Sequence, residues 1–286
     1  MTTIKNLFRN TSEYENKEIT LEGWVKTVRD SKTFGFIELN DGSFFNNLQI
    51  VFNDKLANFE EVRKLTISSS IIVNGKVVKT ENAKQPFEIH ADSVEIFNLA
   101  DADYPLQKKR HSFEYLRTVA HLRPRTNTFN AVFRIRSVAA FAIHEYFQNN
   151  GYVYVNTPII TCADCEGSAE MFKLTTLDLD KPLPQKDGKT DFSEDLFGKK
   201  AYITGSGQLH GETFAEAYGK IYTFGPTLRS ENSNTKTHAN EFWMIEPEIA
   251  FCDLEQLMDI EEDCLKFVVS RVLEKCPEEM EFFNNF

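Results

Sequence analysis

The sequence predicts an α+β protein with more than one domain: a small β-barrel at the N-terminus, followed by a domain of helices and antiparallel strands. Three observations support this prediction. The length of 286 residues favours two domains. The first hundred residues alternate strand-like runs with turns, whereas a long helical pattern begins near residue 129. Two apolar runs within residues 224–251 flank one polar loop, as two antiparallel strands would.

The N-terminal residues 1–100 contain five strand-like runs, separated by turn signals such as Asn40-Asp41-Gly42-Ser43. A helical run at residues 55–65 falls between the third and fourth strands. Five strands with a helix after the third predict an OB-fold barrel. Another small barrel of unrelated function stays open, because a fold alone does not fix function. The strand-like runs are residues 19–28, 33–39, 44–52, 70–80 and 87–97.

Residues 101–126 have the composition of a hinge with a basic patch. Between residues 108 and 125 there are six basic residues and one acid, Glu114. The net charge of −11 argues against RNA only superficially, because residues 246–286 hold twelve acidic and three basic residues. A local basic patch, not the net charge, contacts phosphates. The alternative is a solvated linker without a ligand.

Residues 127–286 form the predicted second domain. An amphipathic helix at residues 129–149 ends at Asn150-Gly151, and a strand at residues 152–158 ends in Pro158. The polar residues 175–200 predict a surface insertion, and residues 254–274 predict an acidic helix.

Polar side chains are expected to cluster on one face of the predicted strand pair. Alternate strand residues share a face, so Arg229 and Glu231 point the same way, as do Phe242, Glu246 and Glu248. Polar groups on an inward face require a ligand or a partner. The strand pair is therefore a candidate binding site.

Composition argues against several classes of protein. No run approaches the roughly 20 apolar residues of a membrane span, and the N-terminus lacks a signal peptide's apolar core. The five cysteines are too few and too scattered for a secreted disulfide framework. Cys162 and Cys165 form a lone CxxC without a second pair of ligands, so we predict no metal site. We expect a cytoplasmic protein.

The strand pair carries the most specific motif. Arg229-Ser230-Glu231, a polar loop and Glu241-Phe242 together resemble motif 2 of class II aminoacyl-tRNA synthetases. The loop sequence from Arg229 to His238 is similar to that of the asparaginyl enzymes, and the insertion at residues 175–200 resembles that of their bacterial type. Gly23-Trp24-Val25 resembles the first barrel strand of the aspartyl, asparaginyl and lysyl subgroup. The long helix and the strand ending in Pro158 resemble motif 1, which implies a homodimer interface at Pro158.

The resemblance implies an ATP site on the strand pair. Arg229 and Glu231 would be catalytic: Arg229 would hold the α-phosphate as charge develops there, and Glu231 would accept from the adenine amine. His238 would reach the γ-phosphate side, and Phe242 would stack on adenine.

The resemblance also implies an asparagine site, with Glu166, Ser206, Gln208 and Glu246 around the amino acid. Aspartyl relatives carry Lys where this chain has Gly211, and Asp where it has Glu246. Both differences favour a side-chain amide over a carboxylate, because a carboxylate would meet like charge and lack a cation.

On the barrel, the resemblance implies an anticodon site made by Arg29, Phe36 and Gln49. Phe36 would stack on one base and Gln49 would read the middle uridine. Stacking and amide hydrogen bonds are common means of reading single-stranded RNA.

The implied reaction joins asparagine to tRNA(Asn) through an asparaginyl-adenylate made from ATP with Mg²⁺. Two alternatives stay open. One is an aspartyl or non-discriminating synthetase, against which Gly211 and Glu246 argue. The other is a catalytically inactive, truncated tRNA-binding paralogue.

The second alternative arises because motif 3, a Gly-rich strand and helix, is missing: no Gly follows Gly225. The chain thus has the pattern of an N-terminal portion of a synthetase, with the Mg²⁺ ligands expected mainly in the missing part.

We therefore expect the 286-residue chain alone not to form adenylate at a useful rate, because half of the ATP and amino-acid contacts are absent. Asparagine-dependent pyrophosphate exchange measures this directly. Robust exchange by this chain would contradict the assignment of motif 3.

Overall fold

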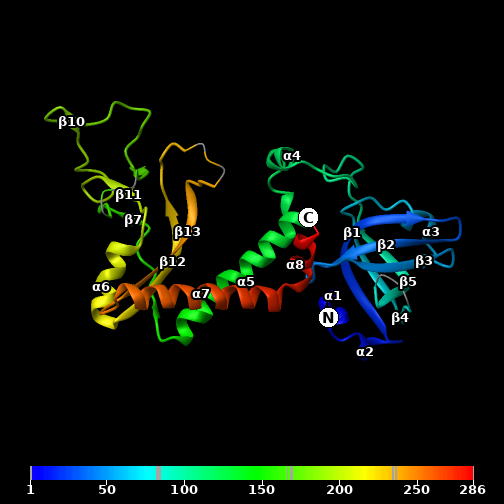
Figure 1. Cartoon of the computed structure of the whole chain (residues 1–286). Helices are drawn as coiled ribbons and strands as arrows, with labels where there is room; N and C mark the ends of the chain where they lie inside the picture. The colour runs from blue at the N-terminus through cyan, green and yellow to red at the C-terminus, as the bar shows by residue number, and fades with distance from the viewer. Residues whose placement is uncertain are drawn as a thin grey trace. The chain divides into compact units, whose positions relative to one another are not determined.

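The computed structural model describes residues 2–81, 85–165, 167, 170–233, 235 and 237–285. The chain forms two compact units, Met1–Ser137 with Lys275–Phe286 and Val138–Glu274. Helix α5 (Asn127–Asn149) begins in the first unit and ends in the second (Figure 1). None of the described helices combines the length and apolar character that crossing a membrane requires.

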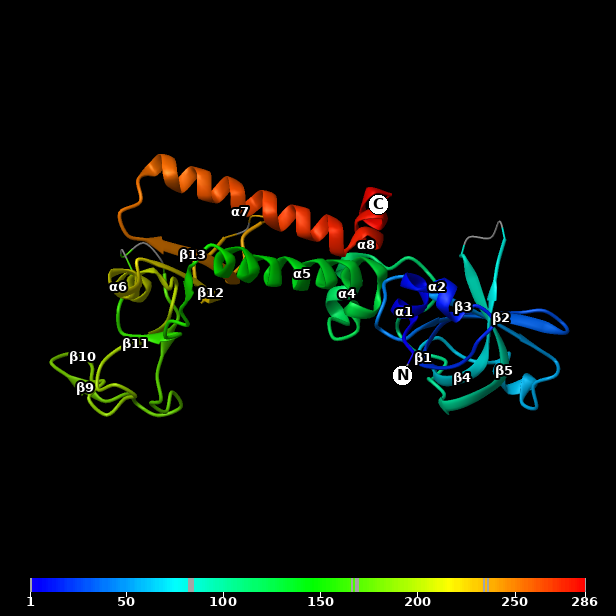
Figure 2. The same cartoon turned by 90° about the horizontal axis from the view of Figure 1, so that it is seen from below.

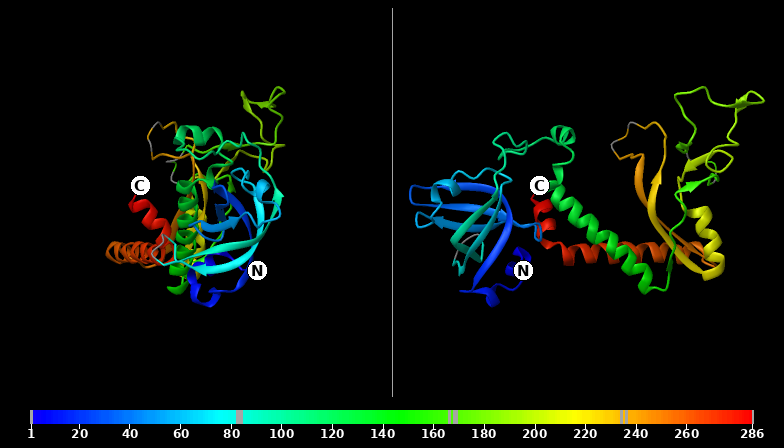
Figure 3. Two further views of the ribbon diagram at one scale, coloured as in Figure 1. Left: turned by 90° about the vertical axis from the view of Figure 1, so that its right-hand side faces the viewer. Right: turned by 180° about the vertical axis from the view of Figure 1, so that it is seen from behind.

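The first unit contains the predicted OB-fold barrel. Its five strands close in the order β1-β2-β3-β5-β4, with all neighbours antiparallel except β3 and β5. Figure 3 shows the strands curving around a common interior. The strands are β1 (Glu18–Asp30), β2 (Phe34–Asn40), β3 (Leu48–Asn53), β4 (Ser70–Lys79) and β5 (Phe87–Asn98).

Alternation along β3 illustrates how the sequence builds this barrel. Leu48, Ile50 and Phe52 point inward and are fully buried, whereas Gln49 and Val51 remain partly exposed on the outer face. Each buried apolar side chain contributes roughly 1.5–3 kcal/mol. The inward residues thus stabilise the barrel, and the outer face is left for binding.

The third strand starts later than the sequence pattern predicted. It begins at Leu48 rather than at residue 44, because the Asn40 amide donates to the carbonyl oxygens of Phe44 (3.2 Å) and Asn46 (3.4 Å) and holds this segment in a loop. Phe44 is still buried, with its ring 4.9 Å from that of Phe8.

The helices of the barrel also differ from expectation. The predicted helix at residues 55–65 shrinks to α3 (Phe59–Val62), because turns occupy the residues before it, with the Leu56 amide donating to the Asn53 carbonyl. Two unpredicted helices, α1 (Ile4–Arg9) and α2 (Thr11–Tyr14), precede β1. Ile4 of α1 joins the barrel core.

The rest of the first unit is the linker and the last helix. The linker contains α4 (Phe113–Thr118) and the 3₁₀ helix η1 (Arg123–Arg125). Helix α8 (Pro277–Asn284) packs within the same unit, where Glu278 pairs with Arg9 at 2.8 Å and Phe282 lies 5.4 Å from Phe45.

The second unit is built on the predicted antiparallel pair, β12 (Lys220–Leu228) and β13 (Glu241–Ile249). A short strand β6 (Val153–Tyr154) adds to β12 in parallel. The strand predicted at residues 152–158 is therefore too long, since its pairing with β12 covers only two residues.

Two long helices support this sheet, as predicted. Phe147 of α5 stacks on Tyr222 of β12, with ring centroids 4.7 Å apart. Helix α7 (Leu254–Lys275) runs along the second half of α5 (Figure 2), where Arg271 pairs with Glu145 at 2.5 Å. Phe147 is buried in this packing, whereas Phe133 and Phe141 of the same helix are exposed.

A second small sheet and one helix complete the unit. Its strands pair in the order β7-β11-β8, and α6 (Gln208–Tyr218) packs on β12 and β13. The strands are β7 (Ile160–Thr161), β8 (Lys173–Leu174) and β11 (Ala201–Ile203).

The insertion at residues 175–200 has one short hairpin, β9 (Gln185–Lys186) and β10 (Lys189–Thr190). Asp195 is buried and accepts from the Thr175 hydroxyl (2.5 Å) and from the amide and hydroxyl of Thr176. These hydrogen bonds, led by that from Thr175, hold the pKa of Asp195 well below its usual range. The sequence pattern did not identify this anchor.

Candidate functional site

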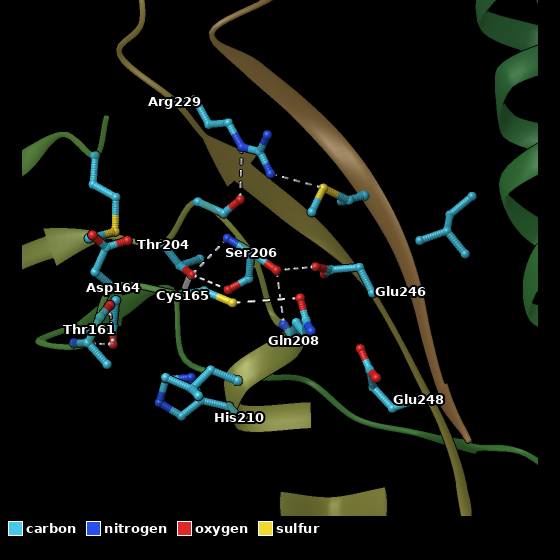
Figure 4. Close-up of a pocket in the computed structure, with 16 residues that line it drawn as sticks. Thr161, Asp164, Cys165, Thr204, Ser206, Gln208, His210, Arg229, Glu246 and Glu248 are labelled. Atoms are coloured by element: carbon cyan, nitrogen blue, oxygen red, sulfur yellow. Dashed lines mark hydrogen bonds between the residues drawn. The ribbon is translucent and has the colours of Figure 1, made fainter. Parts of the chain in front are cut away.

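A cavity of about 270 Å³ opens in the second unit beside the strand pair (Figure 4). The described lining residues come from β7, from the segment between β7 and β8, from the turn before α6 and the start of α6, from Arg229 just after β12, and from β13. The described lining residues are Thr161, Ala163, Asp164, Cys165, Met171, Thr204, Gly205, Ser206, Gln208, Leu209, His210, Arg229, Met244, Ile245, Glu246 and Glu248.

Glu246 is the most heavily hydrogen-bonded side chain of this cavity. Its carboxylate accepts from the Ser206 hydroxyl, from the Gly207 amide (3.0 and 3.1 Å) and from the Thr223 hydroxyl (2.8 Å). These donors occupy most of the acceptor capacity of a carboxylate. Glu246 therefore fastens the turn before α6 to the sheet.

Glycine is required at residue 207 because the turn before α6 lies very close to the sheet, and not because of its backbone angle. A Cβ at residue 207 would lie 2.8 Å from the Thr157 hydroxyl, 3.0 Å from the Glu246 carboxylate and 3.1 Å from the Thr223 hydroxyl. Any larger side chain would push the turn away from Glu246. This turn places Ser206 and Gln208 on the cavity wall. The Gln208 side-chain nitrogen donates to the Glu212 carboxylate at 3.0 Å.

Arg229 brings a cation to the opposite wall. Its Nε donates to the Gly205 carbonyl at 3.2 Å, Nη2 lies 3.9 Å from the Met244 sulfur, and the guanidinium lies 5.6 Å from the Phe242 ring centroid. None of the described ion pairs uses Arg229. A held guanidinium without a carboxylate partner suits an anionic group of a ligand.

Glu231 has an acceptor without a partner. One carboxylate oxygen accepts from the Glu170 amide at 3.2 Å, while Oε2 is buried and lacks a hydrogen-bond partner among the described residues. An unpaired buried acceptor is costly, so such a group fits a donor from a ligand. An amino group on a flat heteroaromatic ring is one such donor.

Glu248 is the titratable group most perturbed in the cavity. Burial, followed by the charges of Glu212 and Glu246, raises its pKa from 4.5 to about 7. A Cβ on Gly211 would lie 3.4 Å from the Glu248 side chain, so only glycine leaves that space open. The sequence pattern placed Glu248 on the correct face but gave it no role.

The structure brings together only part of the predicted ligand set. Ser206, Gln208, Glu246 and Arg229 line one cavity. Glu166 lies outside the described residues.

The other predicted residues of this unit lie around the cavity rather than in its wall. Phe242 lies beneath Arg229. His238 is exposed in the loop between β12 and β13, and Pro158 follows β6.

The two cysteines of the CxxC motif are free thiols. Cys165 lines the cavity, with its sulfur 3.7 Å from the side-chain oxygen of Gln208. Over the described ranges, no group of three His, Cys, Asp or Glu side chains is arranged to hold a metal ion.

A second candidate site lies on the outer face of the barrel. The Arg29 guanidinium lies 6.0 Å from the Phe36 ring centroid and 3.8 Å from Glu38, and Phe34 meets Phe36 edge to face at 5.6 Å. The partly exposed Phe36 ring and the neighbouring cation form a platform of the kind that stacks on bases.

Gln49 lies on the same face, since its strand partner is Glu38. Its amide nitrogen donates to Glu88 at 2.9 Å, and Glu88 also meets His90 at 2.8 Å. The Gln49 side-chain oxygen is thereby oriented while the amide is held. Glu88 and His90 were missed, because only the closure of the barrel brings β5 beside β3.

Comparisons with known families and proteins cover the parts of the chain that carry these two candidate sites. The model of the tRNA synthetases class II (D, K and N) matches residues 112–286, and the model of the OB-fold nucleic acid binding domain matches residues 19–97. The chain is 62% identical over 286 residues to an asparagine–tRNA ligase of Acetivibrio thermocellus, covering all of this chain and 62% of that protein.

Two further relatives extend this result. An asparagine–tRNA ligase of Clostridium beijerinckii is 61% identical over 283 residues, covering 99% of this chain and 61% of that protein. The crystal structure of asparaginyl-tRNA synthetase from Pyrococcus horikoshii complexed with asparaginyl-adenylate matches with a TM-score of 0.83 and 28% identity. That match covers 99% of this chain and 60% of the other.

The chain thus spans about three-fifths of the length of these relatives. The first family model covers more than half of the chain, and it includes both strands of the candidate site. Because that family model covers more than half of the chain, this chain belongs to the class II tRNA synthetases of the D, K and N group.

Proposed function

We propose that this chain is part of an asparagine–tRNA ligase, which activates asparagine with ATP and transfers it to tRNA(Asn). The identity of 62% to a protein of that name supports the substrate pair. The observation that carries the proposal is the cavity itself, in which Arg229 is the only Lys or Arg among the described lining residues, facing the carboxylates of Asp164, Glu246 and Glu248.

The charge of this cavity favours asparagine over aspartate. A substrate carboxylate would meet Glu246 and Glu248, whereas a substrate amide offers two N–H donors to such acceptors. Gly211 leaves the position beside Glu248 without a side chain, so no cation from α6 reaches it. The carboxylates of the cavity and the absence of this cation argue against an aspartyl or non-discriminating enzyme.

The activation step requires the substrate carboxylate and the α-phosphate of ATP to be held together. Arg229, fixed by the Gly205 carbonyl and the Phe242 ring, would stabilise the negative charge that develops on the phosphate. Glu231, with its free buried oxygen, would accept from the adenine amine. Mg²⁺ would neutralise charge on the phosphates when bound.

The remaining roles belong to the same proposal. Residues 1–100 would bind the anticodon, residues 101–126 would form the hinge, and residues 127–286 would belong to the catalytic domain. His238 would contact the γ-phosphate side of ATP, and Pro158 would lie at a homodimer interface. The enzyme would work in the cytoplasm.

The amino-acid choice is tested by Glu246→Gln in a synthetase that contains this chain and has the full length of its relatives. The variant keeps the size of the side chain and removes its charge. Losing one charged hydrogen-bond partner should lower kcat/KM for asparagine about ten- to a hundredfold and reduce discrimination against aspartate. Both constants are measured for wild type and variant.

Thr223→Val is the matched control, because it removes one donor to Glu246 and keeps the charge. It should leave the asparagine-to-aspartate ratio close to that of wild type. An unchanged ratio in Glu246→Gln would show that another group discriminates.

The anticodon assignment is tested with Phe36→Ala and Gln49→Ala in the present chain. Losing the stacking surface should weaken binding of an anticodon stem–loop with a central U by about 1–3 kcal/mol. Gln49→Ala should mainly relax the preference for U at the central position. Fluorescence anisotropy with RNAs that differ only at this base measures both effects, and equal affinity of wild type and Phe36→Ala would contradict the assignment.

A third prediction concerns Glu248. Because the folded chain retains the Glu248 proton up to about pH 7 while the unfolded chain loses it near pH 4.5, stability should fall as pH rises through this range. Glu248→Gln should therefore stabilise the second unit by about 1 kcal/mol at pH 8 and have little effect at pH 5, the gain being reduced by solvent screening.

Thermal unfolding of both proteins at the two pH values measures this difference. Glu216→Gln, an exposed carboxylate on the same helix as Gly211, is the control. A gain of equal size at both pH values would show that Glu248 is not held in its neutral form.

A further inference from the structure

A second, larger cavity of about 1070 Å³ lies in the first unit. Its walls come from β1, from β2 and from the linker residues 104–130. The cavity does not include Phe36 or Gln49, but it shares Glu38 and Asn47 with the outer face on which they lie. A ligand on the base-binding platform could therefore continue into this cavity.

The lining of this cavity is strongly cationic. Five of its described residues are Lys or Arg, and one, Glu38, is a carboxylate that already lies 3.8 Å from Arg29. An excess of cations around a concave surface raises the local concentration of anions. The cationic lining residues are Lys26, Lys108, Lys109, Arg110 and Arg125.

Lys26 and Arg125 are the best-defined pair among these cations. Lys26 Nζ donates to the Arg125 carbonyl at 3.3 Å, and Arg125 Nη1 donates to Tyr104 (2.9 Å) and Ser68 (3.1 Å). In the part of the chain that the structure describes, neither residue forms an ion pair.

The surroundings of this pair disfavour two unneutralised charges. Burial, followed by the charge of Arg125, lowers the pKa of Lys26. An anion that binds between the partly buried Lys26 and the neighbouring Arg125 would neutralise these charges.

The second feature of this cavity is the exposed side chain of Trp24. It extends outward from β1 into this cavity and is 50% exposed, although Trp is usually well covered. A phosphate-binding pair beside an exposed aromatic ring is the combination that single-stranded nucleic acid uses, because bases stack on the ring while cations follow the backbone. A lone phosphate ion would use only a small part of this volume.

We propose that this cavity holds the RNA strand that flanks the bases read on the outer barrel face, with a phosphate at Lys26 and Arg125 and an unpaired base against Trp24. The inference rests on the proposed function, because it takes the RNA to be the same molecule that Phe36 and Gln49 contact. It assigns a ligand to the basic linker, for which composition alone left a solvated segment open.

The test uses the 286-residue chain and a fluorescein-labelled anticodon stem–loop RNA, titrated at several salt concentrations. Lys26→Gln keeps an N–H donor for the Arg125 carbonyl and removes the charge. It should weaken binding about tenfold at low salt, equally for RNAs with different central bases, and reduce the salt slope by about one. Trp24→Leu should weaken binding about five- to a hundredfold through lost stacking.

Lys64→Gln is the control, since Lys64 is exposed on the barrel and does not line this cavity. Circular dichroism and thermal unfolding establish that each variant is folded. Unchanged affinity and salt slope in folded Lys26→Gln, with weaker binding in Phe36→Ala, would overturn this inference and leave the proposed function standing.

The opposite pattern separates the two proposals. Weaker binding in Lys26→Gln with none in Phe36→Ala would support the cavity and contradict the anticodon assignment. No binding of the stem–loop by wild type would overturn both.

Discussion

The candidate active site depends on one set of hydrogen bonds, those that Glu246 accepts from Ser206, Gly207 and Thr223. They join three parts of the second unit that are distant in sequence: β13, the turn before α6, and β12. Two further hydrogen bonds hold the same turn, from the Leu228 amide to the Thr204 carbonyl at 3.0 Å and from Arg229 Nε to the Gly205 carbonyl at 3.2 Å. The same carboxylate is one of three that line the cavity, with Asp164 and Glu248, so in the function that we propose it contributes to both structure and selectivity.

This double use has a physical consequence for specificity. A carboxylate that is already fixed by three protein donors does not need to reorganise when an amide arrives, which favours pre-organised recognition. Glu248, which is partly buried and lies near the charges of Glu212 and Glu246, has a pKa raised to about 7.

Sequence patterns predicted the elements whose periodicity is long or whose motif is specific. The five barrel strands, α5, α7 and the β12–β13 pair follow from alternation and helical spacing. Arg229, predicted from motif 2, and Glu246, predicted from the comparison with aspartyl enzymes, both line the cavity. The predicted bounds of shorter elements were wrong where local contacts determine where the element begins or ends. The Asn40 amide holds residue 44 in a loop, so β3 begins later than predicted. Strand β6 ends at Tyr154, because only two of its residues pair with β12.

The residues that sequence reasoning missed share one property: their role arises from closure of a fold rather than from local order. Glu88 reaches Gln49 because β5 closes the barrel against β3, and Thr223 reaches Glu246 because these two residues face each other in the β12–β13 register. Lys26 is the clearest case. In the sequence, Lys26 is only one charged residue of a predicted strand. In the structure, a β-bulge lies between Val25 and Thr27, and the linker folds back so that the Lys26 ammonium group is partly buried beside the Arg125 carbonyl. A charge that folding removes from water without supplying a counter-ion indicates a ligand more strongly than the same charge counted in a basic patch.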